Sequence, residues 1–192
     1  ATDREVRTRF AELSPPVVGA VEVVERLSRR YRLGVIANHP PQCRGVLEDL
    51  GLLGRCEVVL LAEEQGRYKP DPALFLRALE RAEARGAECV MVGDRLDHDI
   101  APAAALGMAT AWIRWPDRTA KGWRPDDPEG LAYLESLQGA ADRGGERVLG
   151  APSPLSRQGR GPGEASAVQP TMIVDTLADL AAAIERLGEP LS

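Results

Sequence analysis

Between residues 17 and 115, two patterns of apolar residues follow one another in turn. Short apolar runs bounded by polar turns are typical of buried strands, and apolar residues spaced three and four apart are typical of helices with one buried face. The apolar runs predict strands at 33–37, 57–61, 89–92, 109–113 and 171–174. The helical spacing predicts helices at 17–31, 43–50, 72–82, about 99–106 and 177–187.

Strands that alternate with helices predict the α/β class. We expect a three-layer, Rossmann-like parallel sheet with helices on both faces, because parallel strands need crossover connections. Three residues reinforce the helix boundaries. Asp71 can cap a helix whose first position is Pro72, and Gly51 suits the left-handed position after a helix end.

Composition narrows the class of protein. The 192 residues are 44% apolar and 28% charged, which suffices for one domain, expected at 15–192. Segment 116–170 is rich in turn-forming residues and predicts a long, loop-rich insertion with a short helix at 128–138.

The net charge of −5 without a basic block argues against a nucleic-acid partner. No apolar run is long enough to span a membrane, and three separate cysteines fit a reducing, cytoplasmic setting.

Polar residues that follow the predicted strands are the candidates for chemistry, because ligands bind at the carboxyl ends of parallel strands. Asp94 follows Gly93 at one such end, and Asp99 opens the next helix, so the two carboxylates suit a hard cation such as Mg²⁺. Lys69 precedes Pro70 in a restricted loop and can neutralise an anion, and Asn38 offers an amide donor. Each residue also has a purely structural interpretation. Asp94 can be a turn residue and Asp99 a helix cap. Lys69 can be a solvated lysine and Asn38 a turn former after a strand.

Together, in this order, these residues resemble the haloacid dehalogenase-like hydrolases. The resemblance spans about residues 15–115 and 171–187 and rests chiefly on segments 68–72 and 92–94 with Asp99. It implies that Lys69 steadies the charge of an aspartyl nucleophile and a phosphoryl group, and that Asp94 and Asp99 hold Mg²⁺ or orient its waters. Asn38 would bind the substrate together with Lys69, and Lys69 and Asp94 would be catalytic.

Two departures from the family pattern change what we expect of this chain. Ala37 stands where the family has a phosphate-binding Ser or Thr. The family's first strand, which ends in two aspartates and supplies the nucleophile, has no counterpart here, and residues 1–14 resemble the end of a helical cap or a linker. We therefore expect most of the cap and the first strand to be absent, the given chain to be inactive, and two strand edges to be left unpaired.

In the family, this missing strand is the centre of the sheet. An unfilled gap there would leave several buried backbone N–H and C=O groups without hydrogen-bond partners, at about 1 kcal/mol or more each. We favour a longer natural protein over a strand from elsewhere in the chain or from a second chain, which would make a homo-oligomer or a strand-donating partner. The alternative within the chain is segment 172–174, which ends in Asp175 and would then offer Asp175 as the nucleophile.

The resemblance implies a Mg²⁺-dependent phosphatase that acts, in its intact form, on a small phosphorylated substrate or anion. Ala37 favours an alternative of a different class, a non-catalytic relative that binds a ligand or partner through the same fold. Dehalogenation is disfavoured, because Gly93 and Asp94 resemble the metal-dependent branch of the family.

Overall fold

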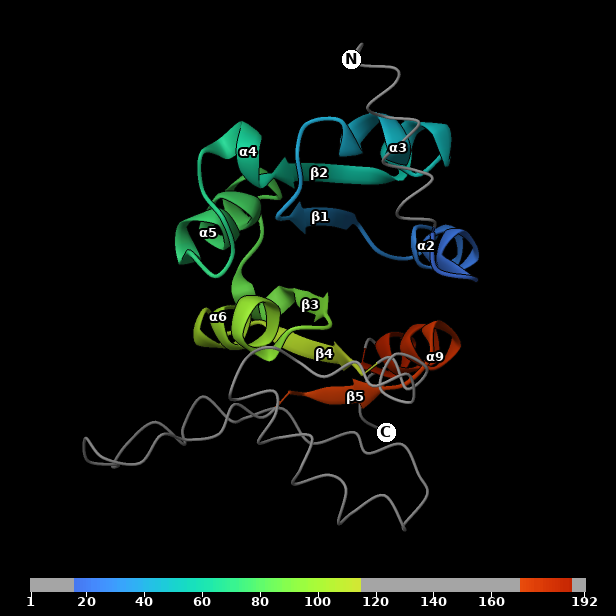
Figure 1. Ribbon diagram of the computed structural model, residues 1–192. Helices are drawn as coiled ribbons and strands as arrows, with labels where there is room; N and C mark the ends of the chain where they lie inside the picture. The colour runs from blue at the N-terminus through green and yellow to red at the C-terminus, as the bar shows by residue number, and fades with distance from the viewer. Residues whose placement is uncertain (1–15, 115–169, 188–192) are drawn as a thin grey trace, which may run out of the picture. The chain divides into compact units, whose positions relative to one another are not determined.

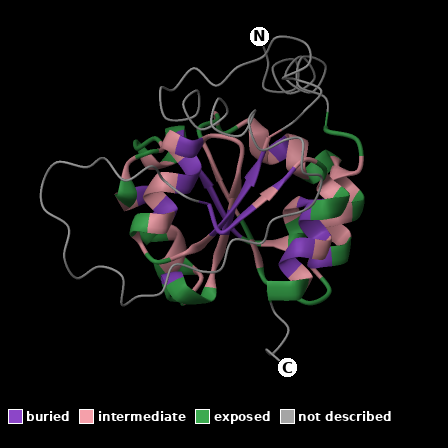
Figure 2. Ribbon diagram, turned by 90° about the horizontal axis from the view of Figure 1, so that it is seen from below, coloured by how far each residue is buried: buried purple, intermediate pink, exposed green. Residues whose placement is uncertain are grey.

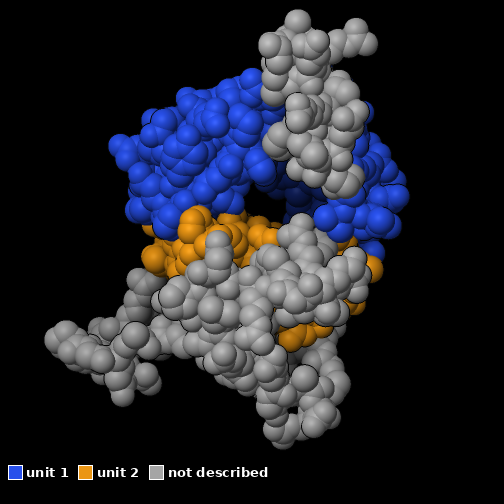
Figure 3. All heavy atoms as spheres, in the orientation of Figure 1, with its two compact units in different colours: residues 1–85 blue, residues 86–192 orange. Residues whose placement is uncertain are grey.

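The computed structural model describes residues 16–114 and 170–187. The predicted cap remnant or linker at 1–14 and, apart from Pro170, the loop-rich segment at 116–170 with its short helix lie outside the described residues. The chain divides into two compact units, residues 1–85 and 86–192, which Figure 3 colours separately. A single domain from 15 to 192 stays a prediction. In the described ranges, no helix is both long enough and apolar enough to cross a bilayer.

The first unit contains a two-stranded parallel sheet and its helices (Figure 1). Leu33 of β1 pairs with Cys56 of β2, and the ladder continues to Ala37 and Leu61. The described elements are, in order, α2 (Ala20–Leu27), β1 (Leu33–Ala37), α3 (Cys43–Asp49), η1 (Leu53–Arg55), β2 (Cys56–Leu61), α4 (Ala62–Gln65) and α5 (Pro72–Arg81).

The second unit contains a three-stranded parallel sheet in the order β3-β4-β5. Its described elements are η2 (Gly86–Glu88), β3 (Val90–Gly93), the π-helix η3 (Leu96–Ile100), α6 (Ala101–Ala105), β4 (Ala109–Ile113), β5 (Met172–Val174) and α9 (Leu177–Leu187). Strands β2 and β4 have four buried residues each, and the helices carry both buried and exposed residues (Figure 2). The predicted α/β class with parallel strands and helices on both sides is therefore confirmed.

Local sequence signals explain why α5 forms where it does. Asp71 Oδ1 accepts a hydrogen bond from the backbone N–H of Ala73 at 2.9 Å, and Pro72 occupies the first helical position, as the sequence predicts. Leu74 on the inner face of α5 packs against Val58 and Leu60 of β2. This contact buries the helix against the sheet that carries Asn38 at the end of β1.

Helix boundaries differ from the prediction in three places. Helix α2 begins at Ala20 because Gly19 adopts a left-handed conformation, with φ of 83°. The one-turn helix α4 stands where the sequence predicts a polar turn, since one turn is too short for a periodic signal. The helix predicted from about residue 99 begins at Leu96 instead, as a π-helix. Gly51 has φ of 69°, as predicted for a helix end.

The strands differ in how far they are buried. Strand β1 is apolar and predicted to be buried, yet none of its five residues is buried. Its partner β2 has four buried residues, as has β4. Among the described residues, β1 pairs only with β2 and β3 only with β4, so each has one edge without a described partner, as have β2 and β5. That a central strand is missing and leaves two edges unpaired stays a prediction.

Strand β5 does not fill such an edge. It pairs with β4 on the side away from β3, so the alternative in which segment 172–174 takes a central position is wrong. Asp175, which that alternative would make a nucleophile, instead accepts two hydrogen bonds from the Arg114 guanidinium, at 2.6 and 2.5 Å.

Two polar pairs hold β4 and β5 together at both ends of their ladder. At one end, the backbone N–H of Thr110 donates to Thr171 Oγ1 at 3.0 Å, and the backbone N–H of Thr171 donates to Thr110 Oγ1 at 3.1 Å. Both threonines are buried. At the other end lies the ion pair between Arg114 and Asp175, whose side chains are 29% and 38% exposed. The buried pair should therefore contribute more to stability than the exposed one.

We expect Thr110→Val to lower the free energy of unfolding by about 1–3 kcal/mol, because it leaves the buried N–H of Thr171 without an acceptor. Urea unfolding measures this change. Arg114→Met is the comparison, with an expected loss of about 1 kcal/mol or less. Equal losses in the two variants would contradict the ranking.

Candidate active site

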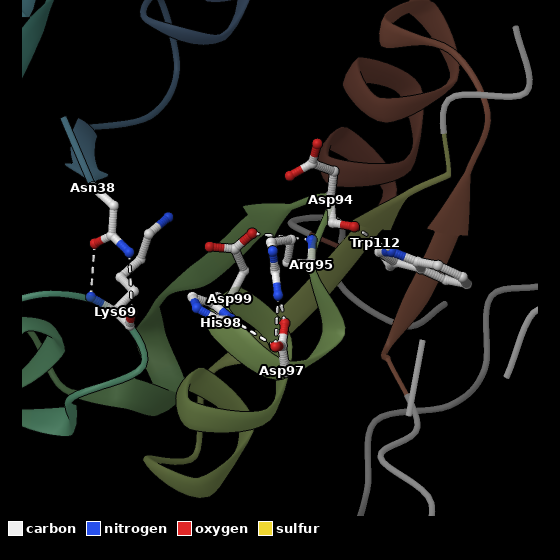
Figure 4. A network of polar contacts seen from close by, with 8 residues as sticks. All are labelled: Asn38, Lys69, Asp94, Arg95, Asp97, His98, Asp99 and Trp112. Atoms are coloured by element: carbon white, nitrogen blue, oxygen red, sulfur yellow. Dashed lines mark hydrogen bonds and ion pairs between the residues drawn. The ribbon is translucent and has the colours of Figure 1, made fainter. Parts of the chain in front are cut away.

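Two of the predicted site residues lie where the chain leaves β3. Asp94 follows Gly93, the last residue of β3, and Asp99 lies in the π-helix η3. The backbone N–H of Ile100 donates to the carbonyl oxygen of Arg95 at 3.2 Å, which is the hydrogen bond of a π-turn. The turn brings Asp99 back to the end of β3, and Figure 4 shows Asp94 and Asp99 extending from that end.

Asp99 is a buried carboxylate, with a side chain that lies directly over Gly93. Asp99 is 4% exposed, and its Oδ2 accepts a hydrogen bond from the backbone N–H of Arg95 at 3.1 Å. A Cβ placed on Gly93 would lie 2.3 Å from Asp99 Cβ and 2.4 Å from Asp99 Oδ2. Position 93 therefore needs glycine, because the Asp99 carboxyl group occupies the space that a side chain would take.

The donor set at this strand end fits a hard cation. Mg²⁺ takes oxygen ligands, commonly from one or two carboxylates, and keeps several waters. Gly93 leaves the space that the Asp99 carboxyl group occupies, one residue before Asp94. In the part of the chain that the structure describes, no group of three or more His, Cys, Asp or Glu side chains gathers as a metal site.

Asp97 organises the polar side chains beside this site. It accepts hydrogen bonds from Arg95 Nε at 3.0 Å and Nη2 at 2.8 Å, and its Oδ2 lies 2.7 Å from His98 Nδ1 (Figure 4). Partial burial raises the pKa of Asp97, but the contacts with Arg95 and His98 outweigh it and lower the pKa to about 2. The Arg95 guanidinium is thereby held on Asp97. Sequence reasoning missed this role of Asp97, although an acid two residues after an arginine is a usable signal.

Trp112 of β4 is a second residue that sequence reasoning missed as part of the site. Its indole Nε1–H donates to the backbone carbonyl oxygen of Asp94 at 3.0 Å. Trp112 is 1% exposed and packs with Leu96 and Ile100. The sequence gives no local signal for this bond, because the two partners lie 18 positions apart.

The other predicted pair lies in the first unit, at the end of β1. Asn38 Nδ2 donates to the backbone carbonyl oxygen of Lys69 at 2.9 Å, and the backbone N–H of Lys69 donates to Asn38 Oδ1 at 2.7 Å. These reciprocal bonds tie the loop carrying Lys69 to the end of β1. The Asn38 amide keeps a second hydrogen that can donate to an anion.

The structure therefore brings the four predicted residues together as two pairs, one in each unit. Asn38 is bonded to Lys69, and Asp94 and Asp99 both lie beside the end of β3. The convergence of both pairs on one ligand stays a prediction. Ala37, the last residue of β1, directly precedes Asn38 and carries no hydroxyl.

Comparison with known proteins places these residues in a family. Residues 2–107 match the sequence profile of the haloacid dehalogenase-like hydrolases. The chain is 32% identical over 125 residues to the pyrimidine 5'-nucleotidase YjjG of Escherichia coli, covering 64% of this chain and 52% of that protein. It is 38% identical over 111 residues to the glyceraldehyde 3-phosphate phosphatase of Pyrococcus abyssi, covering 56% and 46%. The chain thus spans about half the length of these relatives.

Solved structures show the same likeness. A HAD phosphatase from Thermococcus onnurineus superposes with a TM-score of 0.56 at 28% identity, over 72% of this chain and 65% of that one. The putative HAD-hydrolase YfnB from Bacillus subtilis, solved bound to magnesium, superposes with a TM-score of 0.51 at 25% identity, over 57% and 50%.

We expect Gly93→Ala to lower the free energy of unfolding by about 1–3 kcal/mol, because the new methyl group collides with the Asp99 side chain. Urea unfolding gives the change. Gly54→Ala is the matched control, since a Cβ at Gly54 would meet no atom within 4 Å and should change stability by about 0.5 kcal/mol or less. Equal stability of the two variants would show that Asp99 does not depend on the space over Gly93.

Asp97 predicts a pH-dependent contribution to stability. Its pKa is depressed to about 2 in the folded chain, against about 3.9 unfolded, so its contribution is complete above about pH 5 and is lost as the pH falls toward about 2. Asp97→Asn should cost about 1 kcal/mol near neutral pH, after allowance for solvent screening, and less near pH 3.

Paired urea-unfolding curves at the two pH values test this expectation. Glu48→Gln, at an exposed position of α3, is the control and should change stability little at either pH. A cost of Asp97→Asn that stayed constant between the two pH values would refute the assignment.

Proposed function

Since the chain belongs to the haloacid dehalogenase-like hydrolase family, we propose that its active form is a Mg²⁺-dependent phosphatase acting on a small phosphate ester. The observation that carries the proposal is the placement of Asp99 over Gly93 at the strand end that also bears Asp94. A buried carboxylate beside a second one at the end of a parallel strand is suited to binding a cation. The phosphatases among its relatives support a phosphorylated substrate.

Each residue has a distinct role in this proposal. Asp94 and Asp99 hold the cation or orient its waters. Bound Mg²⁺ would supply positive charge against the charge that develops on the phosphoryl oxygens. Lys69, with its backbone fixed by Asn38, presents an ammonium group to the phosphoryl group and to the nucleophile. The Asn38 amide donates its second hydrogen to the bound anion.

The nucleophile in this proposal is an aspartate on a strand that the 192-residue chain does not contain. Its carboxylate attacks phosphorus, the ester oxygen leaves with the alcohol, and water then releases phosphate from the aspartate. The open edges of β1 and β3 support such a strand, because each presents backbone groups that a further parallel strand can pair. Without that strand, we expect no turnover.

A non-catalytic relative is the second candidate, and Ala37 is the observation that favours it. Ala37 offers no hydroxyl to a phosphate oxygen at the end of β1. The two acids and the lysine would then bind an ion or a partner without reaction. A cytoplasmic location, the absence of nucleic-acid and membrane partners, and a homo-oligomer or strand-donating partner stay predictions.

Turnover of p-nitrophenyl phosphate with Mg²⁺ tests the proposal in this 192-residue chain and in a chain extended upstream to the start of the natural reading frame. We expect background hydrolysis in the first and turnover in the second. Asp94→Asn or Lys69→Met in the extended chain should lower kcat by roughly 100-fold or more, because each removes a charge that stabilises the transition state.

Glu48→Gln in the extended chain is the control and should leave kcat unchanged. Turnover by the 192-residue chain that Asp94→Asn abolishes would overturn the claim that the nucleophile lies outside it. An extended chain that binds Mg²⁺ but hydrolyses no phosphate ester would favour the non-catalytic relative.

A further inference from the structure

One peptide group connects both acidic residues of the site to the core. The carbonyl oxygen of Asp94 and the N–H of Arg95 belong to the same peptide unit. The carbonyl oxygen accepts from the Trp112 indole at 3.0 Å, and the N–H donates to Asp99 Oδ2 at 3.1 Å. Since a peptide unit is planar, an interaction that fixes the direction of its C=O also fixes the direction of its N–H.

The indole is held rigidly enough to set this direction. Trp112 is 1% exposed, and its neighbours in the core are Leu96, Ile100 and the partly buried Ile173. A buried tryptophan N–H requires an acceptor, and here the acceptor is the backbone of Asp94. Trp112 is also the ladder partner of Gly93 between β3 and β4. The same residue therefore holds the backbone of Gly93, where the turn begins.

We propose that Trp112 is the positioning residue for the cation site, because its indole orients the peptide between Asp94 and Arg95 and thereby presents Asp94 and Asp99 together. The inference rests on the proposed function, in which these two acids hold Mg²⁺. Trp112 touches neither carboxylate in this role. Its contribution passes through the backbone, to Asp94 directly and to Asp99 by way of the Arg95 N–H (Figure 4).

The hydrogen bond and the packing of the indole make separable contributions. Trp112→Phe removes the N–H donor and part of the ring. Replacement of Trp112 by β-(3-benzothienyl)alanine removes the donor and keeps the size and shape of the bicyclic ring, so it serves where the phenylalanine variant does not fold. Ile173→Val is the matched control, because it loosens packing around the same cluster without a hydrogen bond to Asp94.

Mn²⁺ binding to the 192-residue chain, followed by the electron paramagnetic resonance of the free ion, is the first measurement. We expect both donor-free variants to bind Mn²⁺ roughly tenfold more weakly than the wild type, the lower end of the effect of removing an outer support of a metal ligand. Ile173→Val should stay within about twofold of the wild type. Asp94→Asn and Asp99→Asn should abolish binding.

Amide hydrogen exchange at Arg95, followed by NMR without metal, is the second measurement. The Arg95 amide proton should exchange about tenfold faster in the donor-free variants than in Ile173→Val, because the peptide that donates it to Asp99 is no longer fixed. This readout reports the orientation of the peptide and does not require a bound ion or turnover.

The outcomes separate this inference from the proposed function. If the wild type binds no Mn²⁺, or if Asp94→Asn and Asp99→Asn bind it equally well, the metal role fails and this inference fails with it. If those two variants lose binding while the donor-free variants match Ile173→Val in affinity and in Arg95 exchange, this inference alone is overturned. Weaker binding together with faster exchange supports it.

Discussion

The parallel register between β3 and β4 is the constraint on which the acidic end of the second unit depends. It places Gly93 opposite Trp112, so the indole lies beside the point where the chain turns out of the sheet. A shift of one residue would put a side chain of opposite orientation at that point and remove the donor from the Asp94 carbonyl group.

Two acidic residues after β3, Asp97 and Asp99, are held in place by different interactions. Asp99 is kept by a backbone donor and by the empty position over Gly93, whereas Asp97 is kept by a guanidinium and an imidazole. A backbone N–H holds Asp99 through a neutral donor. The Arg95 guanidinium compensates the charge of Asp97, which suits Asp97 to supporting the turn that contains Asp99.

Much of this organisation can be predicted from the sequence, and the remainder has identifiable physical causes. The strands at 33–37 and 109–113 are short apolar runs between polar turns, and the structure reproduces both ranges. Their burial could not be predicted from the same pattern, since four residues of β4 are buried and none of β1. Asp94 and Asp99 are recognisable from their spacing after a glycine. The bond from Trp112 is not, because it requires the register between two strands that are separate in the sequence.

The two polar pairs at the ends of the β4–β5 ladder have a consequence for how this fold can vary. They fix Thr110 and Arg114 against Thr171 and Asp175 independently of the chain that connects the strands. The entropic cost of closing a connection rises only with the logarithm of its length, by about 0.6 kcal/mol for each doubling. Evolution can therefore lengthen, shorten or exchange that connection at little thermodynamic penalty, and an engineer can use the same junction as a host for a foreign module.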